Sequence, residues 1–129
     1  MSDRPKVMVV EDDEEMNELQ CELLGIHGLD TVPAYTGAQA VEMGGSCGAD
    51  AVLLDVMLPE MDGFETCRRL RKIRGANLPI VMVTALDTDD CREQGLAAGA
   101  DAYFTKPFNP DQIVSTLRDL LGRGDPSPA

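Results

Sequence analysis

The sequence predicts an α/β fold, namely a single doubly wound (βα)5 domain built on a central five-stranded parallel sheet. The 129 residues match the length of one domain, and a chain of this size buries roughly two-thirds of its unfolded surface. Short apolar runs alternate with longer amphipathic segments, which is typical of strands that alternate with helices. Several runs are almost wholly apolar, as expected for parallel strands covered by helices on both faces.

Five apolar runs are the candidate strands. They are Lys6–Val10, Asp30–Tyr35, Ala51–Leu54, Leu78–Val83 and Ala102–Thr105. The second run contains Pro33, which has no N–H to donate to a neighbouring strand. Pro33 therefore predicts that this strand lies at an edge of the sheet.

Two candidate helices precede the third strand. The first has apolar residues at spacings of three and four, which predicts an amphipathic helix ended by Gly28. Its apolar stripe consists of Met16, Leu19, Leu23 and Ile26. The second helix is expected over about residues 37–48, where Gly44 and Gly45 weaken its latter half.

Three further helices are expected in the second half of the chain. The third closes near Gly75, and its apolar stripe is Phe64, Cys67, Leu70 and Ile73. The fourth, about residues 87–98, opens with acids that suit a helix N-terminus, but Gly95 interrupts it, so we expect the loosest helix here. The last begins after Asn109 and Pro110. Its expected buried positions are Ile113, Leu117, Leu120 and Leu121.

Charge and composition exclude several classes of function. The chain has 23 acidic and 11 basic residues and a net charge of -12, a field that repels nucleic acids and anionic membranes. Its uncharged stretches fall short of the roughly 20 residues of a membrane span. No basic segment precedes a long apolar run at the N-terminus, so we expect no signal peptide and a cytoplasmic location.

The cysteines and the single histidine do not indicate a zinc site. Closely paired ligands are absent from the sequence, because its cysteines form no Cys-x-x-Cys pair and His27 is the only histidine. The cysteines, expected to be reduced and mostly buried, are Cys21, Cys47, Cys67 and Cys91. His27 precedes Gly28 at the end of the first helix, where the helix dipole favours it, and we assign it no chemical role.

Polar residues stand directly after four of the candidate strands. They are Glu11 and Asp12 after the first, Asp55 after the third, Thr84 after the fourth and Lys106 after the fifth. In open α/β sheets, ligands bind beyond the carboxyl ends of the strands, so we expect these side chains to converge on one rim. The acids Asp13, Glu14 and Glu15 are interpreted instead as acids favoured at a helix N-terminus.

This combination of groups suits phosphoryl chemistry. Crowded carboxylates repel one another unless a cation neutralises them, and Mg²⁺ uses one or two carboxylates together with water and phosphate oxygens. A phosphoryl group beside Asp55 would be held by the metal, the Thr84 hydroxyl and Lys106. Asp55 is the only acid that follows an apolar run singly, and it is therefore the candidate nucleophile.

With these residues in place, four ordered motifs resemble the receiver domain of two-component response regulators. The motifs are Val9-Val10-Glu11-Asp12-Asp13, Leu54-Asp55-Val56-Met57-Leu58-Pro59-Glu60-Met61-Asp62-Gly63, Val83-Thr84-Ala85 and Lys106-Pro107-Phe108. The resemblance covers residues 5 to about 122, which predicts a receiver domain over 1–122 and a polar tail or the start of a linker over 123–129. It implies a flavodoxin-like architecture with strand order 2-1-3-4-5, which agrees with Pro33 in an edge strand.

The resemblance also implies roles for individual residues. Asp55 would accept a phosphoryl group from a sensor histidine kinase or a histidine phosphotransfer domain. The metal, Mg²⁺ or alternatively Mn²⁺, would be bound by Asp12, by Asp55, by the backbone carbonyl of Met57 and, largely through water, by Glu11.

Further residues would respond to the phosphoryl group. Thr84, Ala85 and Lys106 would contact it, and Thr84 and Tyr103 would form a switch in which the aromatic ring turns inward on activation. Met57 and Leu86 stand at positions that tune hydrolysis of the acyl phosphate in this family. Both are apolar and cannot orient water, so slow autodephosphorylation is expected.

The implied activity is that of a signalling domain rather than an enzyme, apart from self-catalysed phosphoryl transfer. Activation would change the face formed by helix 4, strand 5 and helix 5 and so control an output protein or a C-terminal effector domain outside this chain. The protein would be a monomer or a phosphorylation-dependent dimer. Gln112 and Thr116 stand where many DNA-binding relatives carry an acid and an arginine that join dimers, which disfavours that mode.

Three other functions share part of this pattern. An FMN carrier is excluded because the acids of residues 11–15 would repel a phosphate after the first strand. A dehalogenase-type phosphatase is excluded because Met57 stands where a second acid must transfer a proton. The remaining alternative is a receiver-like interaction module that is never phosphorylated, against which the retention of every site residue argues.

Overall fold

The computed structural model describes residues 4–123, and these form an α/β domain with a five-stranded parallel sheet in the order β2-β1-β3-β4-β5. The strands are β1 (Lys6–Val10), β2 (Asp30–Ala34), β3 (Ala51–Leu54), β4 (Ile80–Thr84) and β5 (Ala102–Thr105). The helices are α1 (Glu14–Ile26), α2 (Gly37–Gly44), α3 (Gly63–Arg74), α4 (Asp89–Ala98) and α5 (Pro110–Arg123). The predicted fold class and strand order are confirmed, and β2, which contains Pro33, lies at an edge.

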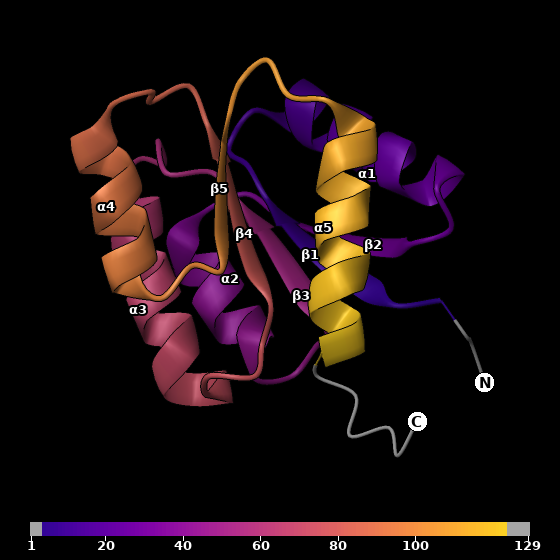
Figure 1. Ribbon diagram of the computed structural model, residues 1–129. Helices are drawn as coiled ribbons and strands as arrows, with labels where there is room; N and C mark the ends of the chain where they lie inside the picture. Colours follow the sequence, from indigo (N-terminus) through magenta and orange to yellow (C-terminus); the bar gives the residue numbers. More distant parts are fainter. Residues whose placement is uncertain (1–3, 124–129) are drawn as a thin grey trace.

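Two hydrophobic cores fill the spaces between the sheet and its helices. Helices α1 and α5 cover one face, and α2, α3 and α4 cover the other (Figure 1). Successive strand residues alternate between the cores: Val7 and Val9 belong to the α1–α5 core, whereas Met8 and Val10 belong to the opposite one. This burial on both faces explains why the strands are continuous apolar runs.

Most predicted boundaries agree with the structure, and the exceptions have local causes. Strand β4 begins at Ile80 rather than Leu78 because Pro79 has no N–H and contributes only its carbonyl, which accepts from Val52 N at 2.9 Å. Helix α2 ends at Gly44 rather than near residue 48, at the glycine pair that weakens it. Helix α4 begins two residues later than predicted because the Thr88 hydroxyl accepts from Cys91 N and acts as its N-cap.

The apolar stripe predicted for α1 is not its buried face. Leu19 is 48% exposed and Ile26 is 78% exposed, whereas the buried residues of α1 are Asn17, Gln20 and Leu24. The Asn17 amide faces the sheet because it donates to the carbonyls of Val9, Glu11 and Ala34 at 3.0–3.1 Å. Apolar periodicity thus identified the helix, but main-chain hydrogen bonding determines which side packs on the sheet.

The other predicted cores are largely confirmed. Cys67 and Leu70 of α3 are fully buried, as are Ile113 and Leu117 of α5, although Ile73 is 46% exposed. All four cysteines are free thiols, but only Cys67 is fully buried, and burial raises the pKa of its thiol to about 11. Within residues 4–123, no helix is both long and apolar enough to cross a membrane. Apart from Arg123, which ends α5, the predicted tail lies outside the described residues.

Candidate functional site

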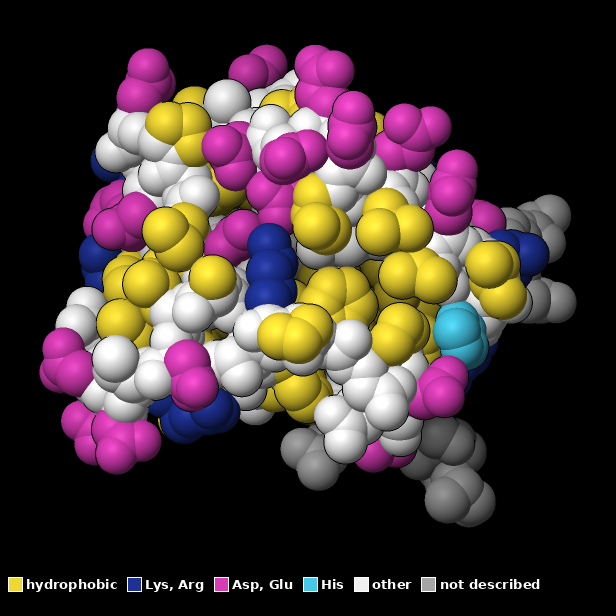
Figure 2. Space-filling view, turned by 90° about the horizontal axis from the view of Figure 1, so that it is seen from above, with side chains coloured by type: hydrophobic (Ala, Val, Ile, Leu, Met, Phe, Trp, Pro, Cys, Tyr) yellow, Lys and Arg dark blue, Asp and Glu magenta, His cyan; other side chains and the backbone are white. Residues whose placement is uncertain are grey.

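The predicted site residues gather at the carboxyl ends of the strands. Val10 and Leu54 are paired in the sheet, so Glu11 and Asp55, which follow them, leave neighbouring strands side by side. Thr84 and Thr105 are likewise paired, so Lys106 follows β5 directly beside the end of β4. The rim lies at the top of Figure 1 and is seen face on in Figure 2, where acidic side chains border an area of hydrophobic ones.

Lys106 joins the two buried acids of this rim. Its Nζ lies 2.8 Å from Glu11 Oε1 and 3.0 Å from Asp55 Oδ2. The side chains of Glu11 and Asp55 are only 4% and 9% exposed, so one ammonium compensates two carboxylates away from bulk water. The peptide bond between Lys106 and Pro107 is cis.

Burial and pairing act in opposite directions on these groups. Burial raises the pKa of Glu11, and the hydrogen bonds from Lys106 and from the Asp13 N–H only partly oppose it. Burial also disfavours the charge on Lys106, but the hydrogen bonds to Glu11 and Asp55 outweigh it and raise the pKa of the ammonium. Lys106 reduces the repulsion between Glu11 and Asp55, but two carboxylates share one ammonium, so the rim keeps an excess of acidic groups.

The loop after β3 fixes the position of Asp55. The carboxylate accepts from Met57 N through Oδ1 at 3.0 Å, and Asp55 N donates to Val10 O. A methyl group at Gly63 would lie 2.4 Å from Asp55 O and 2.5 Å from Val56 Cα. Gly63 therefore allows the start of α3 to pass directly against the main chain of the candidate nucleophile.

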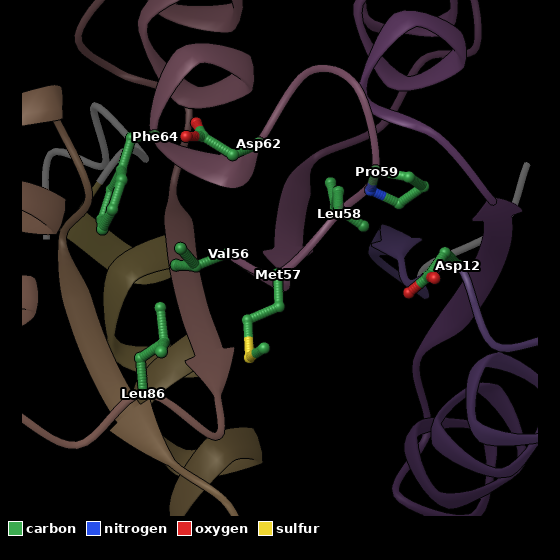
Figure 3. A pocket seen from close by; sticks show the side chains of 8 residues that line it. All are labelled: Asp12, Val56, Met57, Leu58, Pro59, Asp62, Phe64 and Leu86. Atoms are coloured by element: carbon green, nitrogen blue, oxygen red, sulfur yellow. The ribbon is translucent and has the colours of Figure 1, made fainter.

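Asp12 stands apart from the buried pair and lines an open pocket together with Met57. The pocket lining is Asp12, Val56, Met57, Leu58, Pro59, Asp62, Phe64 and Leu86. Figure 3 shows the carboxylate of Asp12 on one side of this pocket and the side chains of Met57 and Leu86 on the other. The pocket therefore combines the carboxylates of Asp12 and Asp62 with an apolar wall that includes Met57 and Leu86 (Figure 3).

The donor set fits magnesium, although it is not a closed metal cage. Within residues 4–123, no three His, Cys, Asp or Glu side chains are gathered closely enough to hold a metal ion by themselves. Magnesium needs no such cage, because it retains several waters and is bound through one or two carboxylates together with phosphate oxygens. Asp12, Asp55 and the Met57 carbonyl provide hard oxygen ligands of this kind.

The remaining predicted residues lie on the β4 and β5 side of the rim. Thr84 is the last residue of β4 and is fully buried, and its hydroxyl accepts weakly from Leu86 N at 3.4 Å. Ala85 is exposed at the start of the following loop. Tyr103 is 6% exposed, burial raises the pKa of its phenol, and its hydroxyl donates to Leu86 O at 2.8 Å. The Tyr103 ring is therefore in the inward, buried position in this structure, the position expected for the activated switch.

The sequence interpretation missed two residues that organise this region. Asn17 connects α1 to the ends of β1 and β2 through its amide, and the sequence gives no signal for it, because α1 contains several other polar residues. Arg92 of α4 donates to Tyr103 O at 2.9 Å. Its neighbours in the sequence are mostly acidic, as in a solvent-exposed helix segment, and they give no indication of that contact. The acids next to the site behave as interpreted: Asp13 is the N-cap of α1, and Glu14 and Glu15 lie in its first turn.

The fold and the site together define a signalling domain with a candidate phosphoacceptor, and sequence comparisons agree. The family model of the response regulator receiver domain matches residues 7–118. The response regulator MprA of Mycobacterium bovis is 40% identical over 96% of this chain and 54% of its own length. The MprA of Mycobacterium ulcerans is 42% identical over 92% of this chain and 50% of its own length.

Solved structures agree as well. The receiver domain of the Francisella response regulator 1452 matches with a TM-score of 0.87 at 31% identity, covering 95% of this chain and all of that chain. The BeF3-activated receiver domain of Klebsiella pneumoniae RstA matches with a TM-score of 0.83 at 39% identity, covering 90% and 97%. The chain therefore belongs to the response regulator receiver domain family of two-component signalling. It spans about half the length of the curated relatives it matches.

Proposed function

We propose that Asp55 accepts a phosphoryl group from a sensor histidine kinase or a histidine phosphotransfer domain, with Mg²⁺ bound at the rim. The contact of Lys106 with both Glu11 and Asp55 supports this most directly, because it connects residues from three strand ends at the candidate nucleophile. Phosphoryl transfer requires mainly positioning and charge neutralisation, and these residues supply both.

The transfer itself is a displacement at phosphorus. A carboxylate oxygen of Asp55 forms the new bond to phosphorus, while the bond from phosphorus to the donor's histidine nitrogen breaks and leaves its electron pair on nitrogen. Lys106 already lies 3.0 Å from Asp55 and neutralises charge on the phosphoryl oxygens. The Thr84 hydroxyl and the Ala85 N–H donate hydrogen bonds to those oxygens.

Magnesium would be held by the acidic part of the rim. Asp12, Asp55 and the Met57 carbonyl would bind it directly, and Glu11 would bind largely through water; Mn²⁺ fits the same oxygen ligands. The ion supplies positive charge between the acids and the incoming phosphoryl oxygens. The surplus of carboxylates over the single ammonium of Lys106 is the feature of this chain that calls for such a cation.

The acyl phosphate is expected to be long-lived. Hydrolysis needs a water molecule positioned against phosphorus, and the two positions expected to influence it carry the apolar side chains of Met57 and Leu86, which line the pocket next to the loop that follows Asp55. Met57 is 55% exposed and carries no group that holds a water in place. The signal of this domain therefore decays slowly.

We propose that the conformational change on phosphorylation is transmitted through the loop between β4 and α4. The Thr84 hydroxyl contacts Leu86 N, and Leu86 O accepts from the Tyr103 hydroxyl, so Leu86 connects Thr84 to β5. A movement of Thr84 toward a phosphoryl group is then transmitted to Tyr103 through Leu86. The face formed by α4, β5 and α5 then controls an output protein or a C-terminal effector domain. Gln112 is exposed on that face, so an acid–arginine pair between two copies is not available at this position.

The test is the intact mass of the protein after incubation with acetyl phosphate and Mg²⁺. We expect a gain of one phosphoryl group, which Asp55→Asn and EDTA each abolish. Asp119→Asn removes an exposed acid from α5 and is the matched control, expected to gain the group like the parent. A folded parent that gains no phosphoryl group from acetyl phosphate or from a histidine phosphotransfer protein would instead indicate an interaction module that is never phosphorylated.

A further inference from the structure

Gly95 lies in the middle of α4, where glycine weakens a helix, and Tyr103 gives a reason for it. A methyl group at Gly95 would lie 2.9 Å from Tyr103 Cδ2 and 2.9 Å from Met82 Sδ. The edge of the tyrosine ring thus occupies the space that any side chain at position 95 would need. Glycine destabilises the middle of a helix, but at position 95 it leaves room for the inward ring of Tyr103 to pack against α4.

Arg92, one turn earlier on α4, covers the face of the same ring. Its Cζ lies 5.1 Å from the ring centroid, within the range of a cation–π contact. Its Nη1 also donates to Tyr103 O at 2.9 Å, so the guanidinium is held at both the ring and the main chain. Residues three apart share one face of a helix, and Arg92 and Gly95 therefore act on Tyr103 together.

The phenol end of the ring is held by a third contact, outside α4. Tyr103 Oη donates to Leu86 O at 2.8 Å, in the loop that follows Thr84. With 6% of its surface exposed, Tyr103 is enclosed on β5, an edge strand of the sheet beside α4 (Figure 1). An outward ring would lose the cation–π contact and the hydrogen bond to Leu86, and would leave a gap beside Gly95.

We propose that Arg92 and Gly95 form a seat for Tyr103 that makes the inward ring its resting position in this chain. Arg92 is then a positioning residue for the switch: it acts on Tyr103 and, through Tyr103, on the Leu86 carbonyl beside the phosphoryl site. All of these contacts are made by residues of the chain itself. The signalling meaning of the seat rests on the proposed function, but its existence does not.

The composition of the chain allows a direct measurement. There are two tyrosines and no tryptophan, so in Tyr35→Phe the emission excited at wavelengths that phenylalanine does not absorb comes from Tyr103 alone. Tyr35 is half-exposed, and its structural contact is made by its main-chain N–H, which Phe retains. Acrylamide quenching of this variant, without Mg²⁺ or phosphoryl donor, reports how accessible the Tyr103 ring is.

We expect slow quenching in the Tyr35→Phe parent and a quenching constant raised several-fold by Arg92→Ala and by Gly95→Ala. Arg92→Lys restores a cation over the ring without the planar guanidinium and should give an intermediate value. Two controls should match the parent: Glu93→Ala, next to Arg92 on the exposed side of α4, and Gly25→Ala, where an added methyl group meets no atom within 4 Å.

The proposal is overturned if the parent is quenched as readily as free tyrosine, or if Arg92→Ala leaves the constant unchanged while far-UV circular dichroism stays native. Arg92 is only partly buried, so its variant is expected to fold even if Gly95→Ala does not. A protein that takes up no phosphoryl group on Asp55 but shows the expected quenching would refute the proposed function and support the seat.

Discussion

The two rims of the sheet use the same kinds of charged groups in opposite ways. At the amino ends of the strands, Arg71 donates to the carbonyls of Gly75, Leu78 and Gly99 and pairs with Asp101 at 2.9 Å. Asp101 in turn accepts from Ile80 N. All of these acceptors belong to the folded chain, so the charge of Arg71 is compensated without a ligand.

At the carboxyl ends the balance is reversed. A single ammonium, Lys106, is shared by Glu11 and Asp55, and Asp12 adds a further carboxylate at the edge of an open pocket. This rim retains an excess of acidic groups that a bound cation would compensate. The amino-end rim is therefore organised for stability, whereas the carboxyl-end rim is the one to which the proposed binding and transfer belong.

The largest expected effect is on transfer at the carboxyl-end rim. Lys106→Ala removes the positive charge aimed at the phosphoryl oxygens and should slow phosphorylation by acetyl phosphate about 10²–10³-fold. Intact-mass time courses with Mg²⁺ measure the rate. Lys72→Ala, an exposed lysine of α3, is the control and should leave it unchanged. A Lys106→Ala rate within a factor of about three of the parent contradicts the role of this residue.

At the amino-end rim the same kind of truncation should affect stability instead. Arg71→Ala leaves three main-chain carbonyls without their side-chain donor and Asp101 without its charge partner, and should lower the free energy of unfolding by about 3 kcal/mol. Urea denaturation measures this loss. The phosphorylation rate of the folded variant should equal that of the parent, and a slowed rate would show that the two rims are not separable.

The apolar wall of the pocket is expected to control the lifetime of the phosphorylated state. The double variant Met57→Asn with Leu86→Glu places hydrogen-bonding groups beside Asp55 and should accelerate loss of the phosphoryl group about tenfold. The mass is followed after donor removal. Leu96→Glu, an exposed apolar residue of α4 outside the pocket, is the control. An unchanged half-life in the double variant would show that water is oriented elsewhere.

A matched pair of substitutions compares the stability of the two rims directly. Asp101→Asn breaks a satisfied pair and should destabilise the fold by about 1–2 kcal/mol. Asp55→Asn relieves the repulsion between Asp55 and Glu11 and should stabilise it by up to about 1 kcal/mol. Both are measured by urea denaturation without Mg²⁺. Equal destabilisation by the two variants would remove the distinction between the rims.

The smallest effect concerns the pair between α1 and α5. His27 Nδ1 lies 2.8 Å from Leu23 O and Nε2 lies 3.0 Å from Asp111 Oδ1. The contact with the Leu23 carbonyl and then that with Asp111 raise the pKa of His27 above 6.5, although Arg118 opposes this. Protonated His27 therefore stabilises the fold fully below pH 6.5, and this contribution is lost as the pH rises through the folded pKa.

The measurement is the melting temperature of the parent and of His27→Gln across about pH 6 to 9. The parent should exceed the variant by a margin that shrinks as the pH rises. A margin that grows with pH would show that neutral His27 is the form that stabilises the fold.

The sequence predicted the carboxyl-end rim well because its residues follow strands directly. Once the apolar runs are recognised as parallel strands, Glu11, Asp55, Thr84 and Lys106 must leave the sheet at the same edge. The sharing of Lys106 between two acids was not predictable, because it depends on side-chain directions that spacing does not encode. The positions of these residues are confirmed, but the roles assigned to them, and those assigned to Asp12, Met57, Ala85, Leu86 and Tyr103, stay predictions.

Helix packing was harder to predict than strand order. The apolar periodicity of α1 predicted a stripe whose members Leu19 and Ile26 are exposed, because Asn17 turns the helix so that its amide reaches three carbonyls of the sheet. Gly95 was interpreted only as an interruption of α4, whereas the structure gives it a packing partner, Tyr103. In both cases the missing information is a contact between residues distant in the sequence.

If Asp55 is the phosphoacceptor, the phosphoryl group must be found on that residue and on no other. Borohydride reduces an aspartyl phosphate to homoserine, which peptide mass mapping places at a single residue after treatment with acetyl phosphate and Mg²⁺. We expect homoserine at position 55 and at none of the other acids, and its loss when Mg²⁺ is removed. Homoserine at another acid, or its absence from a folded protein treated with every class of donor named above, would contradict it.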